Sequence, residues 1–223
     1  MNLFYLDEDL EKCAQYHIDS HVVKMPLEAA QLLTTTVWVD RLIGYAPRKL
    51  SAEELAVIKD FKATQPAIDE RTFTRFLPTH PNHPCAIWTR TSLANYEWVF
   101  GYCDALNSEW QYRYDHDNDH KAFTAALSLP EPARLPNKGL TERPLCMPAD
   151  CFDDDPIHAY RLYYMVDKAD FAVWKKRQYP PWWDLDFVEY SGKDPHQSYI
   201  NTTMAPTNRG KPHGQERLYY VRS

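Results

Sequence analysis

The sequence predicts a mainly α protein: a single compact helical domain with long proline-rich loops and a basic C-terminal tail. Apolar residues recur at helical spacing in several long stretches, while the alternation typical of half-buried strands is nearly absent. Hydrophobic residues make up 44% and aromatic residues 14% of the 223 positions, which is enough to bury a sizeable core. Prolines outnumber glycines by 17 to 6, which favours loops of fixed conformation.

Two helices are expected near the N-terminus. Asp7 can cap a short first helix that runs to Tyr16. The second helix covers roughly residues 20–41, where apolar positions follow a helical period. Pro26 lies inside this pattern, so it must either kink the helix or start a new one.

The next two helices carry clear start signals. Ser51 and the two glutamates that follow resemble a capping box, which predicts a helix to about Lys62. Proline suits the first turn of a helix, so Pro84 predicts the start of a long helix that runs to about Tyr112.

The C-terminal part is expected to be loop-rich. Residues 122–156 are interrupted by prolines and predict an ordered loop with a short helix at its start. Pro156 then opens a last helix that extends through Trp174. We therefore divide the chain into a helical domain, residues 1–205, and a basic tail, residues 206–223.

Composition limits the partners and the compartment. The net charge is -6, so nucleic acid must bind through local basic patches. Five cysteines show no CxxC pattern, which indicates reduced thiols in a cytoplasmic protein. No stretch approaches the roughly 20 apolar residues of a membrane helix, and the first residues do not form a signal peptide. We expect no membrane partner.

Six polar side chains recur along the second predicted helix. Spacings of 4, 3, 4, 3 and 4 residues place them within an arc of roughly 100° on an α-helix. Such a stripe favours a catalytic or binding face, and the alternative is a solvent-facing edge. If Pro26 starts a new helix, the two histidines leave the stripe. Its members are His17, His21, Lys24, Glu28, Gln31 and Thr35.

A proline-stiffened loop precedes the fourth predicted helix. It carries His80 and His83 beside free N–H groups at a helix N-terminus, which suit a phosphate or carboxylate. His83 or Asn82 could instead cap the helix. We expect the two histidines to carry protons or to contact phosphate, and Arg90 and Asn95 to bind substrate.

Several common site types have no signature in the sequence. The three histidine pairs lie outside the HExxH and CxxC contexts that make zinc motifs specific, so we expect no metal and no cofactor. The Gly-rich phosphate loop is missing, which excludes nucleotide hydrolysis by a P-loop. The pairs are His17/His21, His80/His83 and His116/His120.

Basic and aromatic residues are interleaved in residues 159–183. Lysine and arginine neutralise phosphates while aromatic rings stack on bases, so this pattern is typical of a nucleic-acid groove. Lys175, Arg177 and Trp182 are the candidate DNA contacts. The alternative is that the rings pack in the core and the charges extend past them to solvent.

Three segments together resemble a group of bacteriophage-encoded proteins described as pyrimidine-dimer DNA glycosylase-like, of the endonuclease V type. In that enzyme type, the amine at the chain start attacks C1′ of the damaged nucleotide and forms a Schiff base. A helix carboxylate assists, and a basic, aromatic C-terminal segment binds the distorted duplex. The resemblance implies a compact helical fold with the chain start at the DNA-facing surface. The segments are residues 1–33, 78–90 and 159–183.

Individual positions match this family unevenly. His17 and Pro26 match its histidine and proline near the catalytic helix, and Pro180 and Trp182 resemble its C-terminal element. The family's amine belongs to a small residue that is exposed when methionine is removed.

At the two reactive positions the chain departs from the family. Because Asn2 is large, Met1 should be retained, and the amine would be that of Met1. The family's catalytic glutamate falls on Lys24, and the nearest carboxylate is Glu28, one turn later. Lys24 could itself supply a Schiff-base amine.

The leading hypothesis is an enzyme that acts on a pyrimidine base in DNA, most simply an N-glycosylase, possibly with lyase activity at abasic sites. Base extrusion would expose the reacting bond. Lys24, Glu28 and His21 are the candidate catalytic residues. One alternative is a transferase that places an amino acid or amine on an activated 5-hydroxymethylpyrimidine. The other is a DNA-binding protein without catalytic activity.

Overall fold

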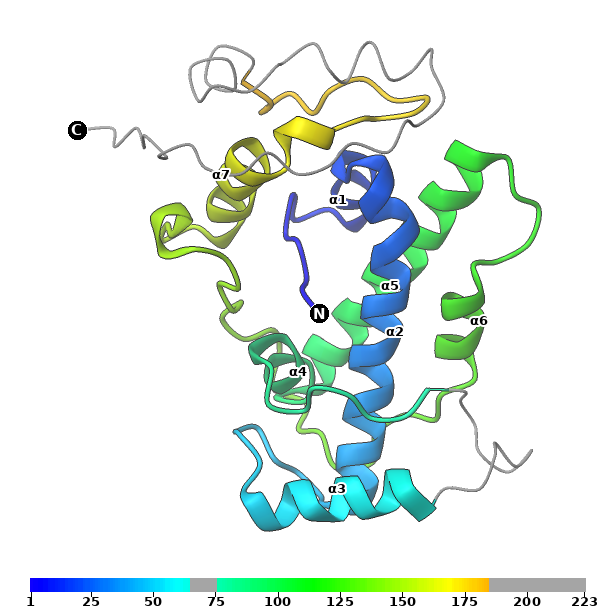
Figure 1. Ribbon diagram of the computed structural model, residues 1–223, viewed down its shortest axis with the longest axis vertical. Coiled ribbons are helices and arrows are strands. Elements are labelled where there is room, and N and C mark those ends of the chain that lie inside the picture. The colour runs from blue at the N-terminus through cyan, green and yellow to red at the C-terminus, as the bar shows by residue number, and fades with distance from the viewer. Residues whose placement is uncertain (65–75, 185–223) are drawn as a thin grey trace.

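The computed structural model describes residues 1–64 and 76–184, and this part of the chain is helical with no strand. The mainly α fold class is confirmed. Helices α2 and α5 pack side by side at the centre of the molecule (Figure 1). The α-helices are α1 (Leu10–Tyr16), α2 (Asp19–Leu42), α3 (Ala52–Thr64), α4 (Pro84–Thr89), α5 (Leu93–Tyr114), α6 (Lys121–Leu127) and α7 (Pro156–Asp167), with 3₁₀ turns η1 (Ala149–Cys151) and η2 (Ala169–Phe171).

Several helix starts follow the expected capping chemistry. The Ser51 N–H donates to the Glu54 carboxylate at 2.8 Å, and the Glu54 N–H donates to the Ser51 hydroxyl at 3.3 Å. This reciprocal pair is the predicted capping box. Pro84 and Pro156 each occupy the first turn of a helix. The first helix is capped by Asp9, whose carboxylate accepts from Lys12, so the expectation that Asp7 caps it is wrong.

Two predicted helix boundaries are corrected, and the alternative left open at Pro26 is decided. Helix α2 continues through Pro26, so this proline does not start a new helix. The helix expected from Pro84 to Tyr112 is two helices, because Ser92 caps the start of α5 and its hydroxyl accepts from Asn95. The last helix ends at Asp167 rather than at Trp174.

The long loop between α6 and α7 is fixed by hydrogen bonds to the start of α5. The Leu93 N–H donates to the Pro136 carbonyl at 3.0 Å, and the Asn95 side chain bonds both the N–H and the hydroxyl of Thr141. The loop then returns towards the chain start on its way to α7 (Figure 1). Side-chain bonds to its backbone thus give this loop a defined path.

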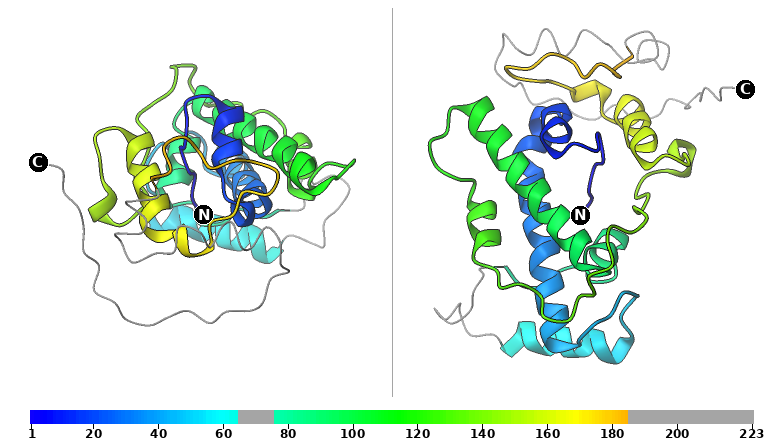
Figure 2. Two further views of the ribbon diagram at one scale, coloured as in Figure 1. Left: turned by 90° about the horizontal axis from the view of Figure 1, so that it is seen from above. Right: turned by 180° about the vertical axis from the view of Figure 1, so that it is seen from behind.

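The N-terminal segment runs through the interior of the molecule. Residues 3–6 are at most 5% exposed and belong to the main core. Figures 1 and 2 show this segment between α2, α5 and α7, with the chain start directed towards α4. Helix α1 follows and packs closely on α5, where a Cβ added at Gly101 would lie 2.8 Å from Leu10 Cδ1. The packing of α1 therefore sets the path of the segment before it.

The remaining features lie at the edges of this core. Helix α3 covers a small second cluster at the end of α2, formed by Val39, Ala46, Leu50 and Ile58. Residues 206–223, the predicted basic tail, lie outside the described residues. No helix in the described ranges 1–64 and 76–184 is both long enough and apolar enough to span a membrane.

Candidate active site

The chain start and the carboxylate of Glu28 meet in the interior. The backbone N–H of Asn2 donates to Glu28 Oε2 at 2.7 Å, and the Met1 amine nitrogen lies 3.8 Å from the same oxygen. Both side chains are nearly buried, at 3% exposure for Met1 and 10% for Glu28. A buried carboxylate needs charged or hydrogen-bonding partners, and here the chain start supplies them.

Lys24 pairs with the other oxygen of the same carboxylate. Its Nζ lies 2.7 Å from Glu28 Oε1, one turn away on α2. The Lys24 side chain is 64% exposed, so the ammonium group faces solvent from the rim of the site. One carboxylate therefore serves two amines: that of Met1, whose side chain is buried, and that of Lys24, whose side chain is exposed.

The Asn2 side chain fixes the chain start against three other parts of the molecule. Its Nδ2 donates to the carbonyl of Cys146 at 2.9 Å, and its Oδ1 accepts from the Tyr160 hydroxyl at 3.1 Å. The Cys85 thiol lies 3.6 Å from the same oxygen. Tyr160 is on α7 and Cys85 on α4, so the second residue connects helices distant in sequence. This position therefore needs a side chain that both donates and accepts, as the asparagine amide does.

A histidine and two cysteines adjoin the chain start. Cys85 and Cys146 have their sulfur atoms 3.5 Å apart, and His83 Nδ1 accepts from the Cys85 backbone N–H at 3.2 Å as the cap of α4. The thiol hydrogen bond raises the pKa of Cys85 and lowers that of Cys146. Burial, followed by the positive charge of the chain start, lowers the pKa of His83, which keeps its ring neutral at pH 7.

The loop histidines divide between the site and the surface. His83 is near enough to the chain start and to Glu28 for both charges to affect its pKa. His80 is exposed, has a φ of 46°, and its Nδ1 lies 2.7 Å from the Thr79 hydroxyl. His83 is therefore the loop histidine that lies near Glu28 and the chain start, whereas His80 lies at the surface.

His17 and His21 are buried inside the protein. His17 precedes α2 and therefore does not lie on its polar stripe. Its Nδ1 lies 2.6 Å from the Cys13 carbonyl, so this nitrogen carries the proton and Nε2 accepts from Tyr102 at 2.7 Å. His21 Nδ1 lies 2.5 Å from the Tyr164 hydroxyl. Burial lowers the pKa of His17 to about 3 and that of His21 to about 2.

Both rings therefore act as neutral hydrogen-bonding groups of the core. His21 also stacks on Phe4, at 4.5 Å between ring centroids, which supports the N-terminal segment that leads to the chain start. This geometry gives His21 a positioning role instead of the predicted catalytic one. It likewise gives His17, predicted to bind substrate, a structural role.

Arg90 and Asn95, both expected to bind substrate, are instead structural. Arg90 is 1% exposed, and its guanidinium donates to the backbone carbonyls of Ala46, Arg48 and Pro81. Burial lowers the pKa of Arg90 to about 10. Asn95 is fully buried and ties α5 to the preceding helix and to the long loop. Neither side chain reaches a surface that a ligand could contact.

The predicted DNA contacts after α7 lie on the surface or near it. Lys175 is exposed and its Nζ lies 5.0 Å from the centre of the Tyr114 ring. Arg177 makes a bidentate pair with Glu109, so its charge is already compensated. Trp182 is half-buried, with the Arg161 guanidinium 5.5 Å from its ring centre. These residues do not contact the chain start.

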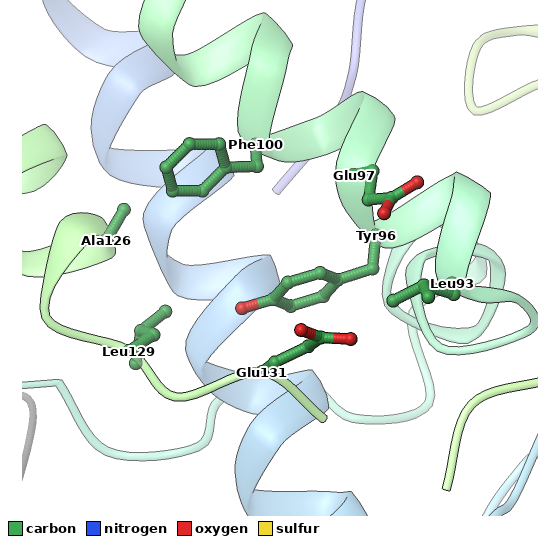
Figure 3. A pocket seen from close by; sticks show the side chains of 7 residues that line it. All are labelled: Leu93, Tyr96, Glu97, Phe100, Ala126, Leu129 and Glu131. Atoms are coloured by element: carbon green, nitrogen blue, oxygen red, sulfur yellow. The ribbon is translucent and has the colours of Figure 1, made fainter. Parts of the chain in front are cut away.

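Two hollows lie away from the chain start. A cavity of about 240 Å³ opens between α5 and the end of α6, where Figure 3 shows the Tyr96 ring beside Glu131. None of the predicted site residues lines it. A second hollow, of about 520 Å³, lies between α1 and α5 and includes Arg177. The residues around the first are Leu93, Tyr96, Glu97, Phe100, Ala126, Leu129 and Glu131.

Sequence reasoning missed three members of the site at the chain start. Asn2 was noted only as a reason for retaining Met1, and the two cysteines were treated as unpatterned thiols. Cys85 lies within the proline-rich loop motif, which was a usable signal, whereas Cys146 is 61 residues farther along in an irregular loop. Nothing in a single sequence pairs two such positions.

Comparison with protein-family models, with curated protein sequences and with solved structures finds no match for this chain. The function is therefore inferred from the geometry at the chain start and from the resemblance to endonuclease V-type glycosylases.

Proposed function

We propose that the protein is a DNA N-glycosylase whose nucleophile is the α-amino group of Met1, assisted by the carboxylate of Glu28. The observation that carries this proposal is the contact between them: the amine nitrogen lies 3.8 Å from Glu28 Oε2, and the neighbouring Asn2 N–H holds that oxygen at 2.7 Å. An amine beside a helix carboxylate is the pair that the resemblance to endonuclease V-type glycosylases implies.

The chain-start amine is the better nucleophile of the two amines at Glu28. The Asn2 side chain holds the chain start in one orientation, whereas Lys24 is 64% exposed on a flexible stem. Fixed orientation favours attack at a single carbon.

The chemical steps balance without a cofactor. The unprotonated amine donates its lone pair to C1′ while the bond from C1′ to the base nitrogen breaks, and the departing base leaves with that electron pair and takes up a proton. The amine then loses a proton to Glu28, the C1′–O4′ bond breaks, and O4′ receives that proton. The result is an iminium ion between the protein and the opened sugar, with Glu28 as the proton carrier.

Borohydride trapping tests the proposal. We would incubate the full chain with duplexes that contain an abasic site or a thymine dimer, reduce with borohydride and map the adduct by mass spectrometry. The expected result is a covalent adduct on the Met1 amine with both duplexes. With the dimer duplex, free thymine should appear only after photoreversal, because the cyclobutane ring keeps the cleaved base attached to its neighbour. An adduct on Lys24, or none at all, would overturn the proposal.

Two controls keep the test specific. A chain extended by Gly-Ser before Met1 moves the amine away from Glu28 and should lose trapping while it retains its helical circular dichroism. Intact mass of the unmodified protein establishes that Met1 carries a free amine. If the protein is a transferase, mass spectrometry of the nucleosides would reveal a heavier intact nucleoside. If it is only a binding protein, a binding assay would show salt-dependent DNA binding, and no product would form.

A further inference from the structure

Three potential metal ligands converge from two loops and the first turn of α4. The ligand atoms of His83, Cys85 and Cys146 all lie within 4.8 Å of one another, and the two sulfur atoms are 3.5 Å apart. Cys85 is buried and the other two are half-buried. Within residues 1–64 and 76–184, this is the one such group of three.

The spacing fits a tetrahedral thiolate site. With zinc–sulfur bonds of about 2.3 Å, two sulfur ligands at tetrahedral angles are about 3.8 Å apart, and a sulfur and an imidazole nitrogen about 3.6 Å apart. The observed sulfur separation differs from this by a few tenths of an ångström. The remaining separations, all within 4.8 Å, require a shift of about 1 Å at most, which side-chain rotation in half-buried residues can supply.

We propose that His83, Cys85 and Cys146 bind a thiophilic divalent metal ion, for which Zn²⁺ is the best match. Two thiolates with one imidazole favour zinc over the oxygen-binding cations. Three protein ligands leave a fourth position, and the Asn2 side-chain oxygen, 3.6 Å from the Cys85 sulfur, is placed to fill it directly or through a water molecule. This inference does not depend on the proposed glycosylase activity.

Metal binding would replace two existing hydrogen bonds. The Cys85–Cys146 thiol hydrogen bond is lost as both thiols release their protons to solvent and bind as thiolates. A neutral imidazole has one nitrogen lone pair, so binding through His83 replaces the bond from the Cys85 N–H to its Nδ1. Proton release should therefore accompany binding and make the measured binding enthalpy depend on the buffer.

Cobalt spectroscopy tests the site directly. We would titrate the reduced full-length protein with Co²⁺ and expect, at one equivalent, the visible bands of tetrahedral cobalt together with near-ultraviolet thiolate-to-cobalt charge transfer. Added Zn²⁺ should remove both. Because even outer partners of metal ligands change affinity by about 10-fold to 100-fold, loss of a direct ligand should weaken Co²⁺ binding at least that much.

The variants separate ligation from folding. Cys85→Ser and Cys146→Ser should each remove the charge-transfer band or weaken binding at least about tenfold. His83→Asn should do the same while it retains a good helix cap. Cys103→Ser is the matched control, since this buried cysteine lies outside the cluster and its thiol donates only to the Pro26 carbonyl. It should bind Co²⁺ as the wild type does.

Three outcomes would overturn the inference. The first is no tetrahedral cobalt spectrum at stoichiometric metal with all five thiols reduced. The second is a spectrum that persists in Cys85→Ser and Cys146→Ser. The third is a Cys85–Cys146 disulfide that is present in protein isolated without reductant and that, after reduction, re-forms in air even with excess Zn²⁺. A bound metal ion would protect both thiols from this oxidation.

Discussion

The backbone N–H of Asn2 donates to Oε2 of Glu28 at 2.7 Å, across 26 residues of sequence. This bond attaches the start of the chain to the middle of α2 and brings the Met1 amine to 3.8 Å from the same oxygen. Of all substitutions at Asn2, only proline removes the backbone donor, and it would also remove the side-chain bonds of Asn2. The acceptor Glu28 is therefore the residue through which this arrangement can be tested.

Glu28→Gln should abolish most of the proposed chemistry while it leaves the fold intact. The amide retains an oxygen for the Asn2 N–H but cannot take up or release a proton. Loss of a proton carrier typically costs 10²–10⁴-fold, so we expect a reduction of about 100-fold or more in the rate of borohydride-trapped adduct formation. Glu97→Gln, an exposed change on α5, is the control and should trap at the wild-type rate.

Lys24→Ala should leave trapping at Met1 in place. The Lys24 side chain is 64% exposed, so its pair with Glu28 contributes at most about 0.5 kcal/mol to the free energy of unfolding. If Lys24 contacts a DNA phosphate, the variant should show weaker binding and a shallower salt dependence, by about one unit in the slope of log K against log salt. If the Lys24→Ala variant no longer formed the trapped adduct, Lys24 would be the nucleophile instead of Met1.

Two buried histidines should make stability fall with acid. The pKa of His17 is about 3 and that of His21 about 2 in the folded protein, both lowered chiefly by burial from 6.5. Below pH 6.5 the unfolded chain takes up protons that the folded chain does not, so the free energy of unfolding falls as pH decreases towards 3. Each histidine should contribute about 1.4 kcal/mol per pH unit in that window.

Urea unfolding at a series of pH values measures this dependence. Replacing His17 by Gln keeps one donor for the Cys13 carbonyl and one acceptor for the Tyr102 hydroxyl. Between pH 6 and pH 4, the slope of the free energy of unfolding against pH should fall by the amount that corresponds to about one proton. His116→Gln, at an exposed position, should leave the slope unchanged. An identical slope in the wild type and in His17→Gln would contradict the assignment of a low pKa to His17.

Arg90→Leu should destabilise the protein without weakening DNA binding of the molecules that remain folded. The guanidinium satisfies three backbone carbonyls at 1% exposure, and each buried group left without a partner costs about 1–3 kcal/mol. We therefore expect a loss of about 3 kcal/mol or more in chemical denaturation. Unchanged stability with a selective loss of DNA affinity would instead restore the substrate-binding role expected from the sequence.

The helices were predictable wherever a local signal marks their start. The Ser51–Glu54 capping box and the prolines at the first turns of α4 and α7 are short-range patterns, and the structure confirms each of them. The break between α4 and α5 was missed because Ser92 is a weaker signal than proline within a continuous apolar pattern. Pro26 was ambiguous because tertiary packing decides what a proline does in a long helix.

The site was predictable only in part, because its members meet through long-range contacts. The stripe on α2 includes Glu28, which the fold brings to the chain start, and it also includes His21, which the fold buries against Tyr164. By residue type alone, His21 and Glu28 are equally good candidates for a catalytic residue. Which one approaches the chain start depends on the path of residues 3–6, and that path is set by core packing.

The close approach of α1 to α5 at Gly101 has a consequence for engineering. A methyl group introduced at that position would lie 2.8 Å from Leu10 Cδ1, which is the far end of a flexible side chain. Rotation of the Leu10 side chain can relieve this contact, so Gly101→Ala should repack the seam between α1 and α5 without moving either helix. The seam therefore tolerates a small change at position 101 that a backbone contact would forbid.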